Sequence, residues 1–236
     1  ELVRDEKTKV FSALRPFPVG SIEEHLVLGQ YAAGIDDGRP VPAYREEDGV
    51  DPHSLTPTYA AMKVYLDNWR WQGVPFFISS GKRLSHKRTE IAIQFKPVPH
   101  SMFRNTIGEP ILANRLVLGI YPEERITLTF QTKNPGATVC LRTVTMDFNY
   151  QQNYAGPALD AYEKALLDCM LGDHMLFWRQ DAVDLSWAFL SPVLTACERC
   201  GDRDRQLHFY AAGSGGPGER DRLFRAGAPM NPAAAG

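Results

Sequence analysis

The chain has 236 residues, of which 44% are hydrophobic and 23% are charged. These values are typical of a globular protein and allow one sizeable core, or a core with an appended tail. The formal net charge of -2 gives no field that would attract nucleic acid. No apolar run approaches the roughly 20 residues needed to cross a bilayer. We therefore expect a protein that binds neither nucleic acid nor membranes.

The first residues and the cysteines indicate where the protein works. Residues 1–7 are charged, do not resemble a secretion signal and do not begin with Met, so we expect the chain to start inside a longer protein. The four cysteines are too few and too scattered for a disulfide framework. Reduced thiols and a cytoplasmic location are therefore expected.

One cysteine pair has the spacing of a metal or redox motif. Cys197 and Cys200 form a CxxC pair, but the sequence offers no second pair, and His208 is the one nearby candidate ligand. A structural zinc site needs four ligands, and a redox pair needs a helix N-terminus that lowers a thiol pKa. The pair lies at the end of a helical pattern instead. We predict structural thiols and no metal site.

The predicted elements begin with a helix over residues 4–14, which Pro16 ends. Apolar and polar residues then alternate with a period of two, which predicts strands of a half-buried sheet. The alternation is strong over 59–66, 90–96 and 125–131, and weaker strands are expected over 23–32, 74–79, 115–121 and 138–148. The first part of the chain thus predicts a large, mainly antiparallel sheet.

Helical spacing replaces this alternation in the last third of the chain. A helix is predicted from Asp160 to a stop at Gly172, and Asp181 is expected to cap another helix that Pro192 kinks or shortens. After Gly201 the sequence is polar and rich in glycine, which predicts a disordered or loosely attached tail. Strands followed by helices indicate the α+β class, with the helices packed on one face of the large antiparallel sheet.

The most unusual chemistry is a basic segment after the predicted strand that ends near Ser79. Five basic side chains fall within seven positions, namely Lys82, Arg83, His86, Lys87 and Arg88. Lysine ammonium groups on a loop between two strands can bind a phosphate dianion as point charges. The alternative is a solvated hairpin loop, and local composition alone favours that alternative.

Three other features of the sequence each offer a functional interpretation and a simpler one. Gly213 to Gly218 match GxGxxG as a string, but the dinucleotide fingerprint needs a strand before it and a βαβ unit around it. We interpret this string as a flexible loop. Trp69 and Trp71 flank Arg70, where packing is favoured over a cation-π role. Asp147, at the end of a strand, could act chemically or simply form a pair.

Several segments together resemble the C-terminal, substrate-side domain of glucose-6-phosphate dehydrogenase. The matching segments occur in the family's order and include 4–7 (RDEK), 29–31 (GQY), 67–76 (DNWRWQGVPF), 81–84 (GKRL), 146–148 (MDF), 160–163 (DAYE) and 171–173 (LGD). The resemblance extends from about residue 1 to about residue 195. Ordered matches over such a span are more specific than any single string.

The resemblance implies a domain over residues 1–200 that binds glucose 6-phosphate and forms homo-oligomers through its sheet, followed by a tail over 201–236. In this family two lysines of the basic loop bind substrate, and they match Lys82 and Lys87. The family's NADP-binding domain, with its catalytic histidine, has no counterpart in this chain. The resemblance therefore implies an NADP-dependent dehydrogenase that makes 6-phosphogluconolactone in the oxidative pentose phosphate pathway. This chain alone is expected to hold no catalytic residue and to be inactive.

Some properties are left open by the resemblance. Animal members bind a second, structural NADP through arginines at positions that read Ser79, Ala92 and Gly119 here, and Arg88 alone keeps a positive charge, so that site is not expected. The choice of NADP over NAD and of dimer over tetramer is not decided. A non-catalytic module that binds sugar phosphate or dimerises is the alternative function.

Overall fold

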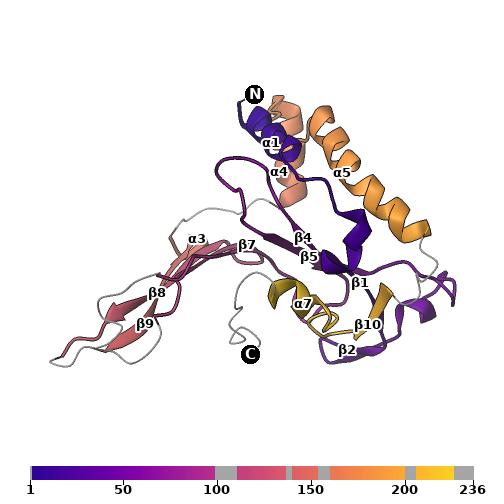
Figure 1. The fold of residues 1–236 in the computed structure, drawn as a ribbon, viewed down its shortest axis with the longest axis horizontal. Helices are drawn as coiled ribbons and strands as arrows, with labels where there is room; N and C mark the ends of the chain where they lie inside the picture. Colours follow the sequence, from indigo (N-terminus) through magenta and orange to yellow (C-terminus); the bar gives the residue numbers. More distant parts are fainter. Residues whose placement is uncertain (1, 99–110, 137–139, 154–159, 200–205, 226–236) are drawn as a thin grey trace. The chain divides into compact units, whose positions relative to one another are not determined.

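The computed structural model describes residues 2–98, 111–136, 140–153, 160–199 and 206–225. These residues form two compact units (Figure 1). The first contains residues 1–85 together with 159–236, and the second contains residues 86–158. Among the helices that the structure describes, none has the length and apolar character required to span a membrane.

The first unit is built on a four-stranded sheet with the order β10-β1-β4-β5. The strands are β1 (Leu26–Ala32), β4 (Tyr59–Val64), β5 (Phe76–Gly81) and β10 (Leu207–Ala211). β4 pairs antiparallel with β1 and with β5, whereas β10 pairs parallel with β1. The strands predicted over 23–32, 59–66 and 74–79 are thus confirmed as neighbours in one sheet.

A small hairpin and two 3-10 helices complete the edges of this unit. The hairpin joins β2 (Gly34–Asp36) to β3 (Arg39–Val41), and the helices are η1 (Val19–Glu24) and η2 (Tyr44–Glu46). Asp37 and Gly38 have φ values of 47° and 75°, which a tight turn between twisted strands requires. The Asp-Asp-Gly sequence of residues 36–38 therefore forms the turn of this hairpin.

Long helices cover one face of this sheet, as the sequence predicts. They are α1 (Leu2–Ser12), α4 (Ala161–Leu171) and α5 (Gln180–Arg199), which Figure 1 shows on the same side of β1, β4 and β5. Val193 and Cys197 of α5 are buried with Phe17 and Leu26 in one apolar cluster. Because β1 alternates, Leu26 and Leu28 contact this cluster while Val27 faces the opposite side.

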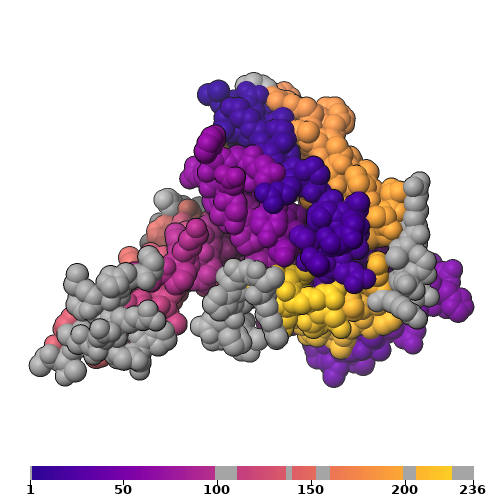
Figure 2. Space-filling view, viewed as in Figure 1, coloured from indigo at the N-terminus to yellow at the C-terminus, as the bar shows by residue number. Residues whose placement is uncertain are grey.

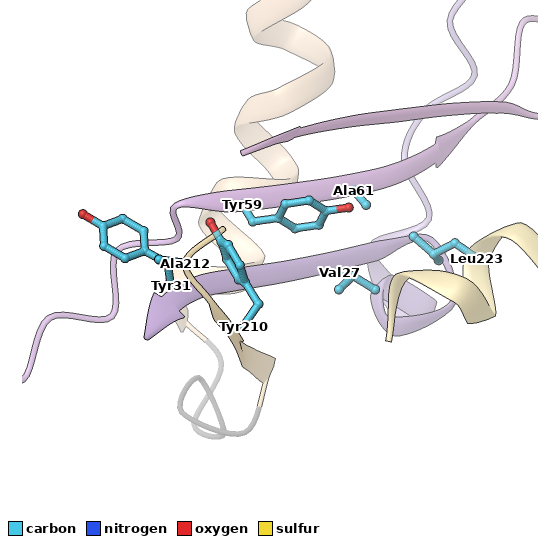
Figure 3. Close-up of a cluster of buried hydrophobic side chains, with 7 residues drawn as sticks. All are labelled: Val27, Tyr31, Tyr59, Ala61, Tyr210, Ala212 and Leu223. Carbon is cyan, nitrogen blue, oxygen red and sulfur yellow. The ribbon is translucent and has the colours of Figure 1, made fainter. Parts of the chain in front are cut away.

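The opposite face of the sheet carries the larger buried cluster (Figure 3). Its members come from β1, β4, β10, the residue that follows β10 and the short helix α7 (Arg220–Arg225), namely Val27, Tyr31, Tyr59, Ala61, Tyr210, Ala212 and Leu223. The rings of Tyr210 and Tyr59 meet with their centroids 5.7 Å apart. A strand and a helix from the C-terminal segment therefore complete a core that begins at residue 27.

This cluster corrects the prediction of a loosely attached tail. Residues 207–211 form a strand of the central sheet, and Leu223 is one of the most deeply buried side chains among the described residues. The polar, glycine-rich composition was misleading because three of the few apolar residues of the segment, Tyr210, Ala212 and Leu223, are buried in one cluster. Residues 200–205 and 226–236, also part of the predicted tail, lie outside the described residues.

The two predicted helices of the last third differ in how well their ends were anticipated. Asp160 caps α4 through a reciprocal capping box with Glu163, and Gly172 ends it with a left-handed φ of 70°, as predicted. α5 begins at Gln180, so Asp181 lies in its first turn and does not cap it from outside. α5 also continues through Pro192 to Arg199, and the prediction of a shortened helix is wrong.

The second unit is a separate four-stranded antiparallel sheet with the order β6-β7-β8-β9. Its strands are β6 (Thr89–Gln94), β7 (Arg115–Tyr121), β8 (Arg125–Lys133) and β9 (Leu141–Asn149), and α3 (Tyr150–Asn153) follows the last strand. The α+β class and the antiparallel pairing are confirmed. The one large sheet of the prediction is two four-stranded sheets, because alternation reports which strands are half-buried and not which strands pair.

The register of the second sheet sorts its side chains by polarity. Leu118 lies opposite Ile91 and Ile126, and Leu128 lies opposite Met146, so apolar side chains line one face. The intervening residues of β8 and β9 are mostly polar, including four threonines, Gln131 and Asp147, and they line the other face. Several members of the apolar face are exposed, including Ile91, Ile120, Met146 and Phe148.

Candidate functional site

Lys82 is the residue that directly follows β5, and its main chain is fixed on both sides. Its N–H donates to the Thr58 carbonyl oxygen over 2.9 Å, and its carbonyl oxygen accepts from the Tyr210 hydroxyl over 2.8 Å. The preceding Gly81 pairs with Tyr59, where a β-carbon would approach the Tyr59 ring to 2.6 Å. Glycine is therefore required for this close approach, and it places Lys82 at the end of the strand.

Arg83, unlike the neighbouring Lys82, is held by carboxylates. Its guanidinium lies 3.3 Å from Asp36 and 3.6 Å from Glu47, and its φ of 51° is in the left-handed region that glycine usually occupies. Glu47 also accepts a hydrogen bond of 2.9 Å from the Tyr31 hydroxyl. Arg83 is thus engaged within the fold, and its charge is partly neutralised.

Lys87 and Arg88 belong to the second unit, which begins at His86. The Lys87 ammonium lies 5.3 Å from the centroid of the Tyr121 ring, a cation-π distance. Arg88 pairs with Glu90 at 3.8 Å. The basic segment is therefore shared between the two units, with Lys82 in one and Lys87 in the other.

These contacts separate the basic side chains into two groups. Arg83 and Arg88 have carboxylate partners. Lys82 and Lys87 are exposed, and in the ranges that the structure describes neither ammonium has a carboxylate within ion-pair distance. An anchored lysine with a free ammonium is well suited to bind a phosphate as a point charge. The two lysines named by the sequence are thus the chemically available members of the segment.

The remaining candidates have structural partners. Trp71 packs against Phe76 with centroids 5.4 Å apart, and the Arg70 guanidinium lies 5.6 Å from the centroid of its ring, so packing is present together with the cation-π contact that was less favoured. Trp69 is 98% exposed, so the prediction of packing is wrong there. Asp147 accepts a hydrogen bond of 2.6 Å from the Thr127 hydroxyl across the sheet, the simpler of its two interpretations.

Metal and dinucleotide sites have no support among the described residues. No group of three or more His, Cys, Asp or Glu side chains in this part of the chain could hold a metal ion. Cys197 is buried in the core, Cys200 lies outside the described residues, and His208 lies 3.5 Å from Glu219. The glycine string from Gly213 follows β10 and packs against β2, with no βαβ unit around it, so its residues do not fit an NADP phosphate.

The C-terminal segment also lines a small, open cavity in the first unit. The cavity has a volume of about 100 Å³ and lies among η1, β1, β10 and α7, with Glu23, Leu26, His208 and Arg222 in its lining. Figure 2 shows the corresponding surfaces, indigo and yellow, side by side. Lys82 does not line this cavity, which is also too small for a sugar phosphate.

Tyr210 is the residue of the site that sequence reasoning missed. Its strand has five residues with an apolar-polar alternation, Leu207-His208-Phe209-Tyr210-Ala211, and this is the signal that could have indicated it. Its partner Lys82 is 128 residues away in the sequence. A single sequence contains no signal for that pairing.

Fold and candidate site together define a class: an α+β domain of mainly antiparallel sheets with an exposed, anchored basic segment after β5. The family model described as "Glucose-6-phosphate dehydrogenase, C-terminal domain" matches residues 1–229. The chain therefore belongs to the family of glucose-6-phosphate dehydrogenase C-terminal domains, and the resemblance of the ordered motifs is confirmed.

Individual relatives agree with the family model. The chain is 44% identical over 222 residues to the glucose-6-phosphate 1-dehydrogenase of Aggregatibacter actinomycetemcomitans, covering 94% of the chain and 43% of the relative. It is 42% identical to that of Treponema pallidum, covering 96% of the chain and 44% of the relative. The chain thus spans less than half the length of these relatives.

Solved structures show the same fold. A glucose-6-phosphate dehydrogenase in complex with its substrate glucose 6-phosphate superposes with a TM-score of 0.83 at 34% identity, covering 97% of this chain and 45% of that one. A glucose-6-phosphate 1-dehydrogenase from Mycobacterium avium superposes with a TM-score of 0.76 at 31% identity, covering 97% of this chain and 44% of that one.

Proposed function

We propose that this chain is the substrate-binding and oligomerising part of an NADP-dependent dehydrogenase that oxidises glucose 6-phosphate to 6-phosphogluconolactone in the cytoplasm. The observation that carries the proposal is the Lys82 ammonium, which is exposed beside a main chain held at both its N–H and its C=O. The fold match to an enzyme solved with glucose 6-phosphate supports the choice of ligand.

The chemistry assigned to this chain is binding and orientation of the sugar phosphate. Lys82 would contact the sugar from its place beside Gly81, and Lys87 would add charge for the phosphate end. Fixing the sugar in one orientation lowers the entropic part of the barrier to its oxidation. NADP would accept the hydride and is assigned to the part of the relatives' length that this chain does not span.

The first test compares the full-length protein with this chain alone. Reduction of NADP is followed in the presence of glucose 6-phosphate. Activity of the full-length protein, with none for the chain alone, supports a dehydrogenase whose substrate-binding half is described above. If the folded full-length protein binds glucose 6-phosphate without oxidising it, the protein is a non-catalytic sugar-phosphate module instead.

Substitution of the two lysines tests the site itself. In the full-length protein, Lys82→Ala or Lys87→Ala should weaken glucose 6-phosphate binding by roughly 1–3 kcal/mol for each charge-assisted contact removed. Lys133→Ala is the matched control, because Lys133 binds carbonyl oxygens of its own hairpin turn, Asn134 and Gly136. If both test variants bind glucose 6-phosphate as the wild type does, the basic segment is only a solvated loop.

The second sheet supports the oligomeric part of the proposal. Ile91 and Ile120 are each 49% exposed and Met146 is 60% exposed, all on the apolar face described above. Contiguous apolar patches of this kind usually mark an interface. A second copy that presents the same face would bury both in a two-fold arrangement.

A charge placed on this face should separate the copies. We expect Met146→Glu to shift the full-length protein toward a smaller species in light scattering or sedimentation, because a carboxylate would be buried without a partner. Thr143→Glu, on the polar face of the same strand, should leave the oligomer unchanged. An identical mass for both variants would place the interface elsewhere.

A further inference from the structure

The main chain of residues 82–85 is bound to a segment that lies more than 120 positions later in the sequence. The Tyr210 hydroxyl donates to the Lys82 carbonyl oxygen, the Gly213 N–H donates to the Arg83 carbonyl oxygen, and the Ser85 N–H donates to the Ser214 carbonyl oxygen, each over 2.8 Å. Leu84 and Ser214 form a parallel β-bridge between these contacts. Residues 210–214, which we call the C-terminal clasp, thus hold the segment that carries Lys82.

Tyr210 is the member of the clasp that contacts Lys82 directly. Its ring is buried in the cluster of Figure 3, and its hydroxyl also lies 3.1 Å from the Thr58 hydroxyl. Thr58 in turn accepts the Lys82 N–H. Burial raises the pKa of Tyr210, so its hydroxyl keeps the proton that it donates. The N–H of Lys82 is therefore bound by Thr58 and its carbonyl oxygen by Tyr210, and Thr58 and Tyr210 also contact each other.

The next residue of the segment is fixed through its side chain as well. Arg83 adopts a left-handed conformation that is unfavourable for a residue with a β-carbon, and its guanidinium pairs with Asp36 and Glu47. Its carbonyl oxygen is bound by Gly213. Tertiary contacts thus impose on the residue after Lys82 a conformation that the local sequence would not adopt.

We propose that Tyr210 is a positioning residue for substrate binding: its hydrogen bond to the Lys82 carbonyl presets the place of the Lys82 ammonium. This inference rests on the proposed function of Lys82 as a ligand of glucose 6-phosphate. A lysine on a fixed main chain loses less conformational freedom when it binds than one on a mobile loop, so affinity rises without an added contact. The C-terminal clasp thereby serves substrate affinity as well as stability.

The test uses Tyr210→Phe in the full-length protein, because phenylalanine keeps the ring in the cluster and removes the hydroxyl alone. We expect the KM for glucose 6-phosphate to rise about fivefold, which corresponds to one hydrogen bond. We expect kcat and the KM for NADP to change by less than about twofold. The variant loses binding energy that is the same in the ground state and the transition state, and such a loss raises the KM without changing kcat. A drop in kcat with an unchanged KM for glucose 6-phosphate would overturn the inference.

Tyr59→Phe is the matched control for loss of a buried hydroxyl. Tyr59 belongs to the same cluster, and its buried hydroxyl has no hydrogen-bond partner among the residues that the structure describes. This variant should retain the KM of the wild-type protein. If Tyr59→Phe raises the KM as much as Tyr210→Phe does, the effect belongs to the cluster in general and the inference fails.

A double variant shows whether Tyr210 acts through Lys82. In a Lys82→Ala background the ammonium is gone, so adding Tyr210→Phe should change the KM no further. If the increase in KM of the double variant equals the product of the increases in the two single variants, the Tyr210 hydroxyl acts independently of the Lys82 ammonium, and the inference is overturned. If Lys82→Ala raises the KM while Tyr210→Phe does not, the positioning role fails and the proposed function stands. If the folded wild-type protein does not bind glucose 6-phosphate, both fail.

Discussion

Gly213 packs against the carbonyl oxygen of Ile35 so closely that a β-carbon on residue 213 would overlap that oxygen. The φ of Gly213 is 80°, in the left-handed region where side chains are disfavoured. The obstructing atom belongs to the main chain of β2 and cannot move aside as a side chain would. This contact joins the C-terminal clasp to the hairpin that carries Asp36, a partner of Arg83.

The first prediction concerns this contact. Gly213→Ala should lower the free energy of unfolding by about 1–3 kcal/mol, because the left-handed conformation is strained and the β-carbon has no space. Gly218→Ala is the matched control, since a β-carbon there meets nothing within 4 Å and no left-handed φ is required. Urea unfolding of both variants measures the difference, and equal losses would contradict the packing of Gly213 against β2.

The second prediction isolates the strain at Arg83. Arg83→Gly and Arg83→Ala both remove the guanidinium and its contacts with Asp36 and Glu47. The glycine variant should be the more stable by about 1 kcal/mol, because alanine keeps the unfavourable left-handed conformation and glycine relieves it. Thermal unfolding compares the two directly. An alanine variant that is the more stable would mean that residue 83 has an ordinary backbone conformation.

The third prediction concerns the acid side of the stability curve. Arg179 lies 2.7 Å from Asp181 and holds the pKa of that carboxyl below its usual value of about 3.9. A carboxyl whose pKa is lowered by folding contributes stability above its unfolded pKa and loses it as the pH falls through its folded pKa. We therefore expect this contribution to be complete at pH 7 and to disappear progressively below about pH 4.

Arg179→Gln tests this contribution. The variant should be less stable than the wild type at neutral pH, and the difference should shrink as the pH falls below about 4. It should also shrink at high salt, because the side chain of Asp181 is 45% exposed and the pair is screened. Denaturant unfolding at a series of pH values measures the difference. A gap that stays constant down to pH 2 would show that Arg179 acts through packing and not through charge.

Parts of the fold could be predicted because their signals are local. The strand expected over 115–121 is found as β7 with the same ends, and the ends of α4 follow from Asp160 and Gly172. β10 could not be predicted with the same ease. Its five residues gain their stability from parallel pairing with β1, about 180 positions earlier in the sequence, and no local pattern reports that pairing.

The candidate site also has features that a local sequence pattern reports and features that depend on tertiary contacts. The basic segment is visible as composition, and the family resemblance singles out Lys82 and Lys87. That Arg83 is paired while Lys82 remains available depends on Asp36 and Glu47, which approach only in the folded chain. Charge counts along a sequence cannot tell a paired cation from a free one, because the pairing is a tertiary contact.

The last prediction concerns Pro192, around which α5 continues without ending. A proline inside a helix lacks the N–H that would bind the carbonyl of Ala188, and its ring crowds that carbonyl. Pro192→Ala should restore the hydrogen bond and raise the free energy of unfolding by about 1–2 kcal/mol, part of the gain being offset by a more flexible unfolded chain. Thermal unfolding measures the change.

Ser191→Ala is the control for Pro192→Ala, because it raises helix propensity at the neighbouring exposed position without restoring a hydrogen bond, and its gain should stay below about 0.5 kcal/mol. The opposite result for Pro192→Ala would also be informative. Val193 and Cys197 follow Pro192 and are buried against Phe17 and Leu26. A loss of stability would mean that the buried contacts of Val193 and Cys197 require the backbone geometry that Pro192 gives α5, so that changing it costs more in packing than the restored hydrogen bond contributes.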